Sequence, residues 1–137
     1  MKYLVDTNVL SECVKTRPNE SVFSKLEKYK DDIVTAAPVW HELQYGCRRL
    51  PRSRKRTIIE AFLNDVVRRN ILILPYDTHA AQWHAQERVR LSSKGKMPPF
   101  VDGQIAAIAK VNALVLVSRN VEDYRLFSGL KTENWHG

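Results

Sequence analysis

Four short segments rich in apolar and β-branched residues are spread along the chain, and each is followed by a segment whose apolar residues have helical spacing. The strand-like segments are Lys2–Val5, Ile33–Ala36, Ile71–Leu74 and Ala113–Val117. Strands that alternate with helices form βαβ units, whose parallel strands pair in one sheet covered by helices on both faces. The pattern therefore predicts an α/β fold with a central, mostly parallel sheet of four to five strands.

Helices are predicted wherever apolar side chains recur every three to four residues. The longest is Arg52–Arg69, in which apolar pairs are separated by charged residues. Pro38 suits the first turn of one helix and Asp77 the N-cap of another. The remaining predictions are helices at Asn19–Lys30 and Phe100–Val111, a loop over residues 92–99, and a short last helix that Ser118 or Asn120 caps and that ends at Phe127.

The chain is short and basic, with 137 residues and a formal net charge of +7. This length predicts a single domain over residues 1–137. No apolar run is long enough to cross a bilayer, and the first residues do not have the pattern of a signal peptide, so we expect a cytoplasmic protein without a membrane partner. A basic surface favours nucleic acid or an acidic protein as the partner. Cys13 and Cys47 are far apart and are expected to be reduced thiols.

Acidic residues lie close to the expected carboxyl ends of the strands, where parallel sheets bind their ligands. Asp6 directly follows the first strand, and Glu42 lies in the helix after the second. Asp123 lies in the short helix after the fourth strand, one turn beyond Asn120. Asp102 is at the start of the apolar helix that precedes the fourth strand. We therefore expect these four carboxylates to converge at one edge of the sheet.

Converging carboxylates repel one another, and a hard divalent cation relieves this repulsion. Mg²⁺ or Mn²⁺ takes oxygen ligands and keeps several waters, one of which becomes acidic enough to attack a phosphodiester. Asp6 and Asp102 are the predicted metal ligands, and Glu42 is a ligand or orients the attacking water. Glu12 is predicted to face the same site without touching the metal. Four such acids on a basic chain indicate phosphate chemistry.

Other catalytic motifs are absent from the sequence. His41 and Glu42 do not begin an HExxH zinc motif, because Tyr45 stands at the place of the second histidine. His79 and His84 are five residues apart and do not share a helix face, which argues against zinc. No glycine-rich loop suited to a nucleotide is present.

Four stretches of the chain resemble the PIN-domain ribonucleases, and specifically the VapC-type toxins of bacterial toxin–antitoxin pairs. They are "LVDTNVLSE", "PVWHELQYG", "PFVDGQIAAIAKVNALVLVSRNVEDYRLF" and "LKTENW". The resemblance extends from Lys2 to Trp135. It implies a three-layer α/β/α fold, an acidic pocket that binds Mg²⁺ or Mn²⁺, and endonucleolytic cleavage of RNA.

The resemblance also implies roles for single residues. Asp6, Glu42 and Asp102 match the three acids of the family. At the fourth position many relatives have an aspartate where this chain has Asn120, whereas others resemble this chain, with an acid three residues later. The fourth role is therefore shared between Asn120 and Asp123. Ser118 occupies a supporting position at which the family usually has a hydroxyl residue. Thr7 and Asn8 match the polar pair of the first motif.

The partners implied by the resemblance are a cognate VapB-type antitoxin, whose tail fills the groove of the toxin, a structured RNA such as tRNA or rRNA, and a second copy of the chain in a homodimer. The basic run is predicted to hold the RNA backbone through Arg48, Arg49, Arg52, Arg54, Lys55 and Arg56. Trp40 and Tyr45 are predicted to be core or dimer contacts rather than positions for base stacking.

Three alternatives remain open. A PIN-fold module without catalysis would bind RNA or protein and leave it intact. A phosphoacceptor receiver domain would need an aspartate directly after the central strand and a lysine after a late strand, whereas here Asp77 lies beyond a proline and the late strand ends in Ser118 and Arg119. A nuclease of this kind with a DNA substrate would have the same charge and the same acids.

Overall fold

The computed structural model describes residues 1–137 and has five parallel strands in one sheet, in the order β3-β2-β1-β4-β5. The strands are β1 (Tyr3–Val5), β2 (Ile33–Ala36), β3 (Leu72–Leu74), β4 (Val115–Val117) and β5 (Thr132–Glu133). The predicted α/β fold with a parallel sheet is confirmed. The fourth predicted strand begins two residues later than expected, because Ala113 has a left-handed backbone with φ of 56° and cannot continue a strand. β5 was not predicted.

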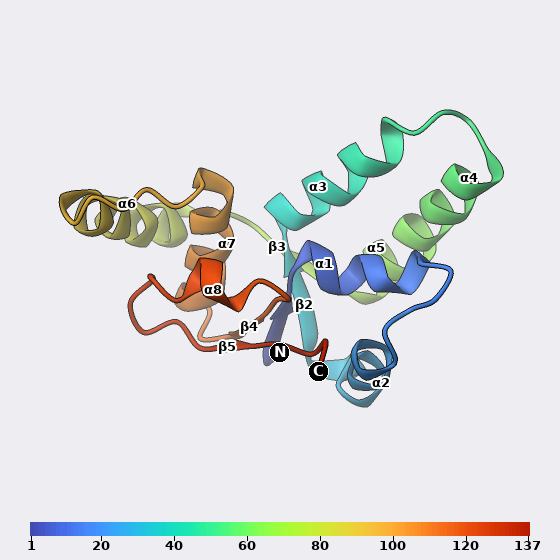
Figure 1. The fold of residues 1–137 in the computed structure, drawn as a ribbon, viewed down its shortest axis with the longest axis horizontal. Helices are drawn as coiled ribbons and strands as arrows, with labels where there is room; N and C mark the ends of the chain where they lie inside the picture. Colours follow the sequence, from blue (N-terminus) through green and yellow to red (C-terminus); the bar gives the residue numbers. More distant parts are fainter.

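Helices on both sides of the sheet complete the three layers (Figure 1). The α3–α4 hairpin projects to one side of the molecule and the α6–α7 pair to the other, and the two chain termini lie close together (Figure 1). The helical segments are α1 (Thr7–Leu10), η1 (Ser11–Val14), α2 (Glu20–Lys28), η2 (Lys30–Asp32), α3 (Ala37–Arg48), α4 (Arg54–Ala61), η3 (Phe62–Val67), α5 (Arg68–Asn70), α6 (Thr78–Ser93), α7 (Phe100–Val111) and α8 (Val121–Tyr124). No helix has the length and apolar character needed to span a membrane.

Local signals account for most helix starts. Asp77 Oδ1 accepts a hydrogen bond of 2.9 Å from Ala80 N, as an N-cap should. Pro38 lies in the first turn of α3. The short helix α8 differs from its prediction, since it ends at Tyr124 and since the side chain of its N-cap, Asn120, makes no capping bond.

The predicted long helix contains a π-helical segment, η3, between α4 and α5. The apolar pairs of this helix recur every four residues, whereas an α-helix has about 3.6 residues per turn, so each repeat drifts by about 40° around the axis. The wider π turn offsets this drift. As a result Leu63 and Val67 both stay buried, packed with Cys47 of α3.

The helices α6 and α7 pack very closely, and this contact fixes the end of α7 that carries Asp102. A Cβ atom placed on Gly103 would lie 2.1 Å from Nε2 of His84, so only glycine fits there. His84 is itself buried, and its Nδ1 lies 2.7 Å from the hydroxyl of Tyr76. The histidine thus serves helix packing.

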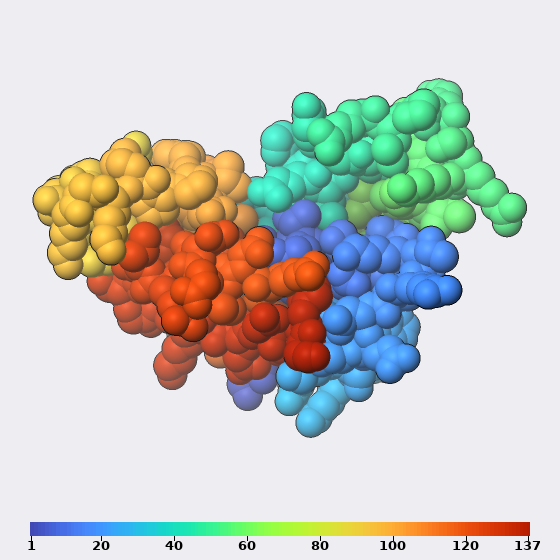
Figure 2. All heavy atoms as spheres, in the orientation of Figure 1, coloured from blue at the N-terminus to red at the C-terminus, as the bar shows by residue number.

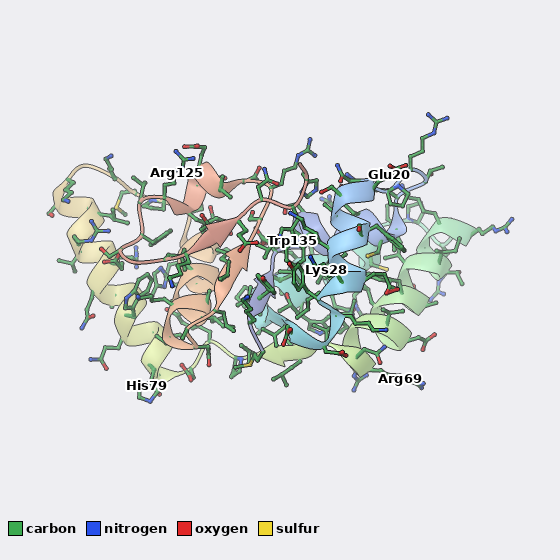
Figure 3. The ribbon with its side chains drawn as sticks, turned by 90° about the horizontal axis from the view of Figure 1, so that it is seen from below. Glu20, Lys28, Arg69, His79, Arg125 and Trp135 are labelled. Atoms are coloured by element: carbon green, nitrogen blue, oxygen red, sulfur yellow. The ribbon has the colours of Figure 1, made fainter.

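The C-terminal residues are part of the core. Trp135 is fully buried, with ring centroids 5.1 Å from Tyr3 and 5.7 Å from Tyr29 (Figure 3). The preceding residues form β5, whose Thr132 pairs with Leu116 of β4. The chain end thereby covers the β4 edge of the sheet.

Candidate active site

The strand order changes direction between β1 and β4. From β1 the chain continues to β2 and β3 on one side, and β4 and β5 lie on the other. Parallel sheets bind ligands at such a switch point, outside the carboxyl ends of the strands. Asp6 lies at this point, and its backbone N donates a hydrogen bond of 2.9 Å to Val117 O at the end of β4.

A pocket of about 330 Å³ opens at this edge of the sheet. In Figure 2 a notch separates the α3–α4 segment from the α6–α7 segment, and the blue N-terminal segment lies at its base. The pocket residues are Asp6, Thr7, Asn8, Ser11, Glu42, Asp102, Asn120, Asp123 and Tyr124. The structure therefore brings together all four acids that the strand-end argument selected.

Each acid comes from a different element. Asp6 is the N-cap of α1 and is buried, with 7% of its surface exposed. Glu42 projects from α3 and is exposed, Asp102 from the first turn of α7 and is half-buried, and Asp123 from α8 and is exposed. The pocket thus has a fixed, buried carboxylate at its base and more exposed carboxylates around it.

A hydrogen-bond network holds the carboxylate of Asp6. Oδ1 accepts from Thr7 N at 2.8 Å. Oδ2 accepts from Ser118 Oγ at 2.8 Å and from the Tyr124 hydroxyl at 3.2 Å. Ser118 Oγ in turn accepts from Asn8 Nδ2 at 3.3 Å and from Asn120 N at 3.1 Å.

The polar pair of the first motif connects this network to its surroundings. Thr7 Oγ1 donates to Glu42 Oε2 at 2.9 Å and so joins α1 to α3. Asn8 Oδ1 accepts from Arg119 N at 3.0 Å and so joins α1 to the segment after β4. Thr7, Asn8 and Ser118 all contact the carboxylates or their neighbours.

The mutual repulsion of the acids is visible at Asp102. Burial raises the pKa of Asp102, and the nearby charges of Asp6, Asp123 and Glu42 raise it further, to about 6. Such a group holds a proton at mildly acidic pH when no cation is bound.

The stability of the metal-free protein should therefore depend on pH through Asp102. The folded-state pKa lies above the unfolded value of 3.8, so the folded protein binds more protons between these two values. Stability from this group is greatest at low pH and falls as pH rises from about 4 to about 7. Urea unfolding in EDTA at several pH values should show this loss as a difference between the parent and Asp102→Asn. Parallel curves for the two proteins would contradict it.

A family model for the PIN domain matches residues 3–126 of the chain. The chain belongs to the PIN domain family. It is 31% identical over 136 residues to ribonuclease VapC2 of Haemophilus influenzae, covering 98% of both chains. It is 28% identical over 137 residues to the tRNA(fMet)-specific endonuclease VapC of Shigella flexneri, again covering 98% of both. Within the family it is thus of the VapC toxin type.

Solved structures agree with this placement. The structure of FitAB bound to an IR36 DNA fragment matches this PIN domain with a TM-score of 0.90 at 27% identity, covering 98% of this chain and 96% of the other. The predicted three-layer PIN-like fold is confirmed.

The donors of this PIN domain's pocket fit a hard divalent cation. All four acids supply carboxylate oxygens, the ligands that Mg²⁺ and Mn²⁺ prefer. No group of three or more histidine, cysteine or acidic side chains is arranged to hold a metal ion by itself. An open pocket is compatible with Mg²⁺, which keeps several waters and needs only one or two carboxylates.

Ser11 and Tyr124 are the two pocket residues that sequence reasoning missed, and of these only the side chain of Tyr124 bonds to one of the four acids. Tyr124 is buried, at 2% exposure, and the apolar environment together with the charges of Asp6 and Asp102 raises the pKa of its hydroxyl. The tyrosine is one residue beyond Asp123 in a short helix, where an aromatic residue is normally a core residue. The neighbouring residues in the sequence do not distinguish a tyrosine that only packs in the core from one whose hydroxyl also bonds to a carboxylate.

Glu12 lies outside the pocket, contrary to its prediction. Its buried carboxylate accepts from Asn19 N at 2.8 Å and is paired with Lys15, and His136 Nε2 lies 3.4 Å away. Lys15 and the backbone bond keep the pKa of Glu12 below its usual value in spite of burial. Glu12 thus connects η1 to α2 and to the chain end.

The predicted RNA-binding residues form the tip of the α3–α4 hairpin of this PIN domain, and none of them lines the acidic pocket. Arg48, Arg52 and Arg56 line a separate cavity of about 200 Å³ between α3 and α4. Arg56 is already paired with Glu60 at 2.7 Å and donates to Leu50 O at 3.1 Å. The exposed members of the set are Arg48, Arg49, Arg52, Arg54 and Lys55.

Proposed function

We propose that this VapC-type PIN domain, a toxin with ribonuclease activity, is an endoribonuclease that depends on Mg²⁺ or Mn²⁺. The observation that carries the proposal is the pocket in which carboxylates from β1's end, α3, α7 and α8 meet on a chain with net charge +7. Carboxylates repel an RNA phosphate unless a cation lies between them. The basic charge elsewhere supplies attraction for the RNA backbone.

The proposed roles of the pocket residues follow from how deeply each side chain is buried. A divalent cation, when bound, supplies positive charge at the phosphate and makes a water more acidic. Asp6, at the base of the pocket, and the half-buried Asp102 would hold it. Glu42 is exposed and tethered through Thr7, and Asp123 is exposed beside Asn120, so these side chains can orient water and the leaving oxygen. Hydrolysis by water leaves a 5′-phosphate and a 3′-hydroxyl.

A structured RNA is the proposed substrate, with tRNA first, because the Shigella flexneri relative is a tRNA(fMet)-specific endonuclease. Unpaired bases in RNA loops are commonly recognised by stacking on aromatic and guanidinium groups. Such groups lie on α3. Glu42, Tyr45 and Arg49 are spaced by three and four residues and so share one helix face.

The face of α3 beyond Glu42 is open. Tyr45 is 60% exposed, so the first alternative of its prediction, a core position, is wrong, whereas the second, a dimer contact, stays a prediction. The guanidinium of Arg49 lies 5.5 Å from the Tyr45 ring centroid, and the ring of His41 is stacked 6.3 Å from it. A base next to the cleaved phosphate could stack on Tyr45, about one helical turn from Glu42.

Tyr45→Ala should therefore weaken RNA binding. Stacking of a base on an aromatic ring contributes about 1–3 kcal/mol, so we expect about a ten-fold loss of affinity or more. Binding of a cleaved-site RNA to an Asp102→Asn background measures this without turnover. Phe23→Ala is the matched control, since Phe23 is an exposed aromatic residue on α2. An altered oligomeric state with unchanged RNA affinity would identify Tyr45 as a subunit contact instead.

The partner is proposed to be a VapB-type antitoxin. Matching solved structures are of FitAB and VapBC, which are toxin–antitoxin complexes. A basic antitoxin side chain placed in the acidic pocket would neutralise the carboxylates in place of a cation. We further propose a homodimer, because exposed apolar residues gather at the α6–α7 end, namely Val89, Met97, Phe100 and Val101.

An end-mapped cleavage assay tests the proposed function. Purified protein without antitoxin is incubated with total tRNA and rRNA in Mg²⁺ or Mn²⁺, with EDTA in parallel. Discrete cuts with 5′-phosphate ends that disappear in EDTA are expected. Intact RNA, with metal binding demonstrated, would favour a binding module without catalysis. Cleavage of DNA in preference to RNA would reassign the substrate.

A further inference from the structure

We infer that Tyr124 is a positioning residue: its hydroxyl holds Oδ2 of Asp6 so that one oxygen of this carboxylate, Oδ1, is left to face a cation. The inference rests on the proposed function, which supplies the cation. The orientation of the carboxylate is taken from the hydrogen bonds around Asp6. It goes beyond the four acids, because it concerns which of the two oxygens of Asp6 is available.

The two hydroxyls that donate to Oδ2, those of Ser118 and Tyr124, donate to no other acceptor. Ser118 Oγ already accepts two hydrogen bonds, from Asn8 Nδ2 and Asn120 N, so both its lone pairs are used and its own proton points to Asp6. The Tyr124 hydroxyl is buried, and its one hydrogen bond is to Asp6 at 3.2 Å. An ionised carboxylate only accepts hydrogen bonds, so the Tyr124 hydroxyl is the donor in this pair.

A count of lone pairs then assigns the free position. The two oxygens of a carboxylate offer about four acceptor positions. Oδ2 receives Ser118 and Tyr124, and Oδ1 receives Thr7 N. The position that remains belongs to Oδ1. Asp6 would therefore bind a cation through a single oxygen, and its carboxylate is held by three hydrogen bonds, from Thr7, Ser118 and Tyr124.

Tyr124→Phe removes the hydroxyl and keeps the ring in the core. Outer partners of metal-binding carboxylates and histidines commonly contribute about ten-fold or more to metal affinity. We expect Mn²⁺ affinity, measured by calorimetry on the full chain, to fall about ten-fold, with the circular dichroism spectrum unchanged. Tyr29→Phe is the matched control, since Tyr29 packs on Trp135 and lies outside the pocket. Equal or tighter Mn²⁺ binding by Tyr124→Phe would overturn the inference.

Crystal structures separate this inference from the proposed function. In crystals of the parent soaked with Mn²⁺, the anomalous signal should lie next to Oδ1 of Asp6; a signal next to Oδ2 would overturn the inference. If the parent takes up no Mn²⁺, the metal dependence fails, and the positioning is then judged from metal-free Tyr124→Phe crystals. There the carboxylate of Asp6 should turn about its Cβ–Cγ bond, and an unmoved carboxylate would show that Tyr124 does not position it.

Discussion

Asp102→Asn should lower RNA cleavage on the order of 10³-fold, because the cation that Asp102 would hold contributes several kcal/mol of charge stabilisation at the phosphate. The amide has nearly the shape of the carboxyl group, so the packing of α7 stays intact. The same variant should be more stable than the parent without metal at pH 7.5. The burial of a charge and the repulsion by neighbouring acids, which together raise the pKa of Asp102 to about 6, both disappear with the charge.

The pair of effects is what makes this variant informative. Lost activity together with raised stability is expected when a residue destabilises the folded protein but is required for its activity. Asp65→Asn, at an exposed aspartate of η3 outside the pocket, is the control and should change neither property. Full cleavage by Asp102→Asn, in purified protein and in the presence of Mg²⁺, would exclude the carboxylate mechanism.

Trp135→Ala should lower the free energy of unfolding by about 3–5 kcal/mol, the usual cost of truncating a buried tryptophan. This is a large share of the about 5–15 kcal/mol that stabilises a domain. Trp135 is fully buried against Tyr3 and Tyr29. The measurement is urea unfolding, with Phe23→Ala on the exposed face of α2 as the control. A loss below about 1 kcal/mol would mean that the chain end is not part of the core.

Trp135→Ala should also disturb the active site. Glu133 precedes Trp135 in the chain, and its backbone O accepts a hydrogen bond of 3.0 Å from Ser118 N. Trp135 Nε1 donates to Glu133 Oε1 at 3.0 Å. The chain end thus holds the segment that carries Ser118, which in turn holds Asp6.

The strands and the four carboxylates could be predicted from the sequence because both depend on short-range features. Short apolar runs and period-3.6 patterns are complete within a few residues, and they predicted β1, β2 and α7 nearly to the residue. The convergence of the acids then follows from a general property of parallel sheets, whose carboxyl ends share one edge. Position relative to a strand end was therefore enough to select Asp6 and Glu42.

Other features depended on contacts between distant parts of the chain. The hydrogen bond from Tyr124 to Asp6 joins residues 118 positions apart. The rotation of α8 relative to β1 decides whether the hydroxyl of this buried ring reaches the carboxylate. Glu12 turned towards Asn19 and away from the pocket because the turn at η1 set its direction. The strand β5 forms only because β4 offers it an open edge. The sequence by itself determined the alternation of elements and the acids at the strand ends, and only the tertiary structure decided which hydroxyls hold those acids, because the relative rotation of packed elements is encoded in no single segment.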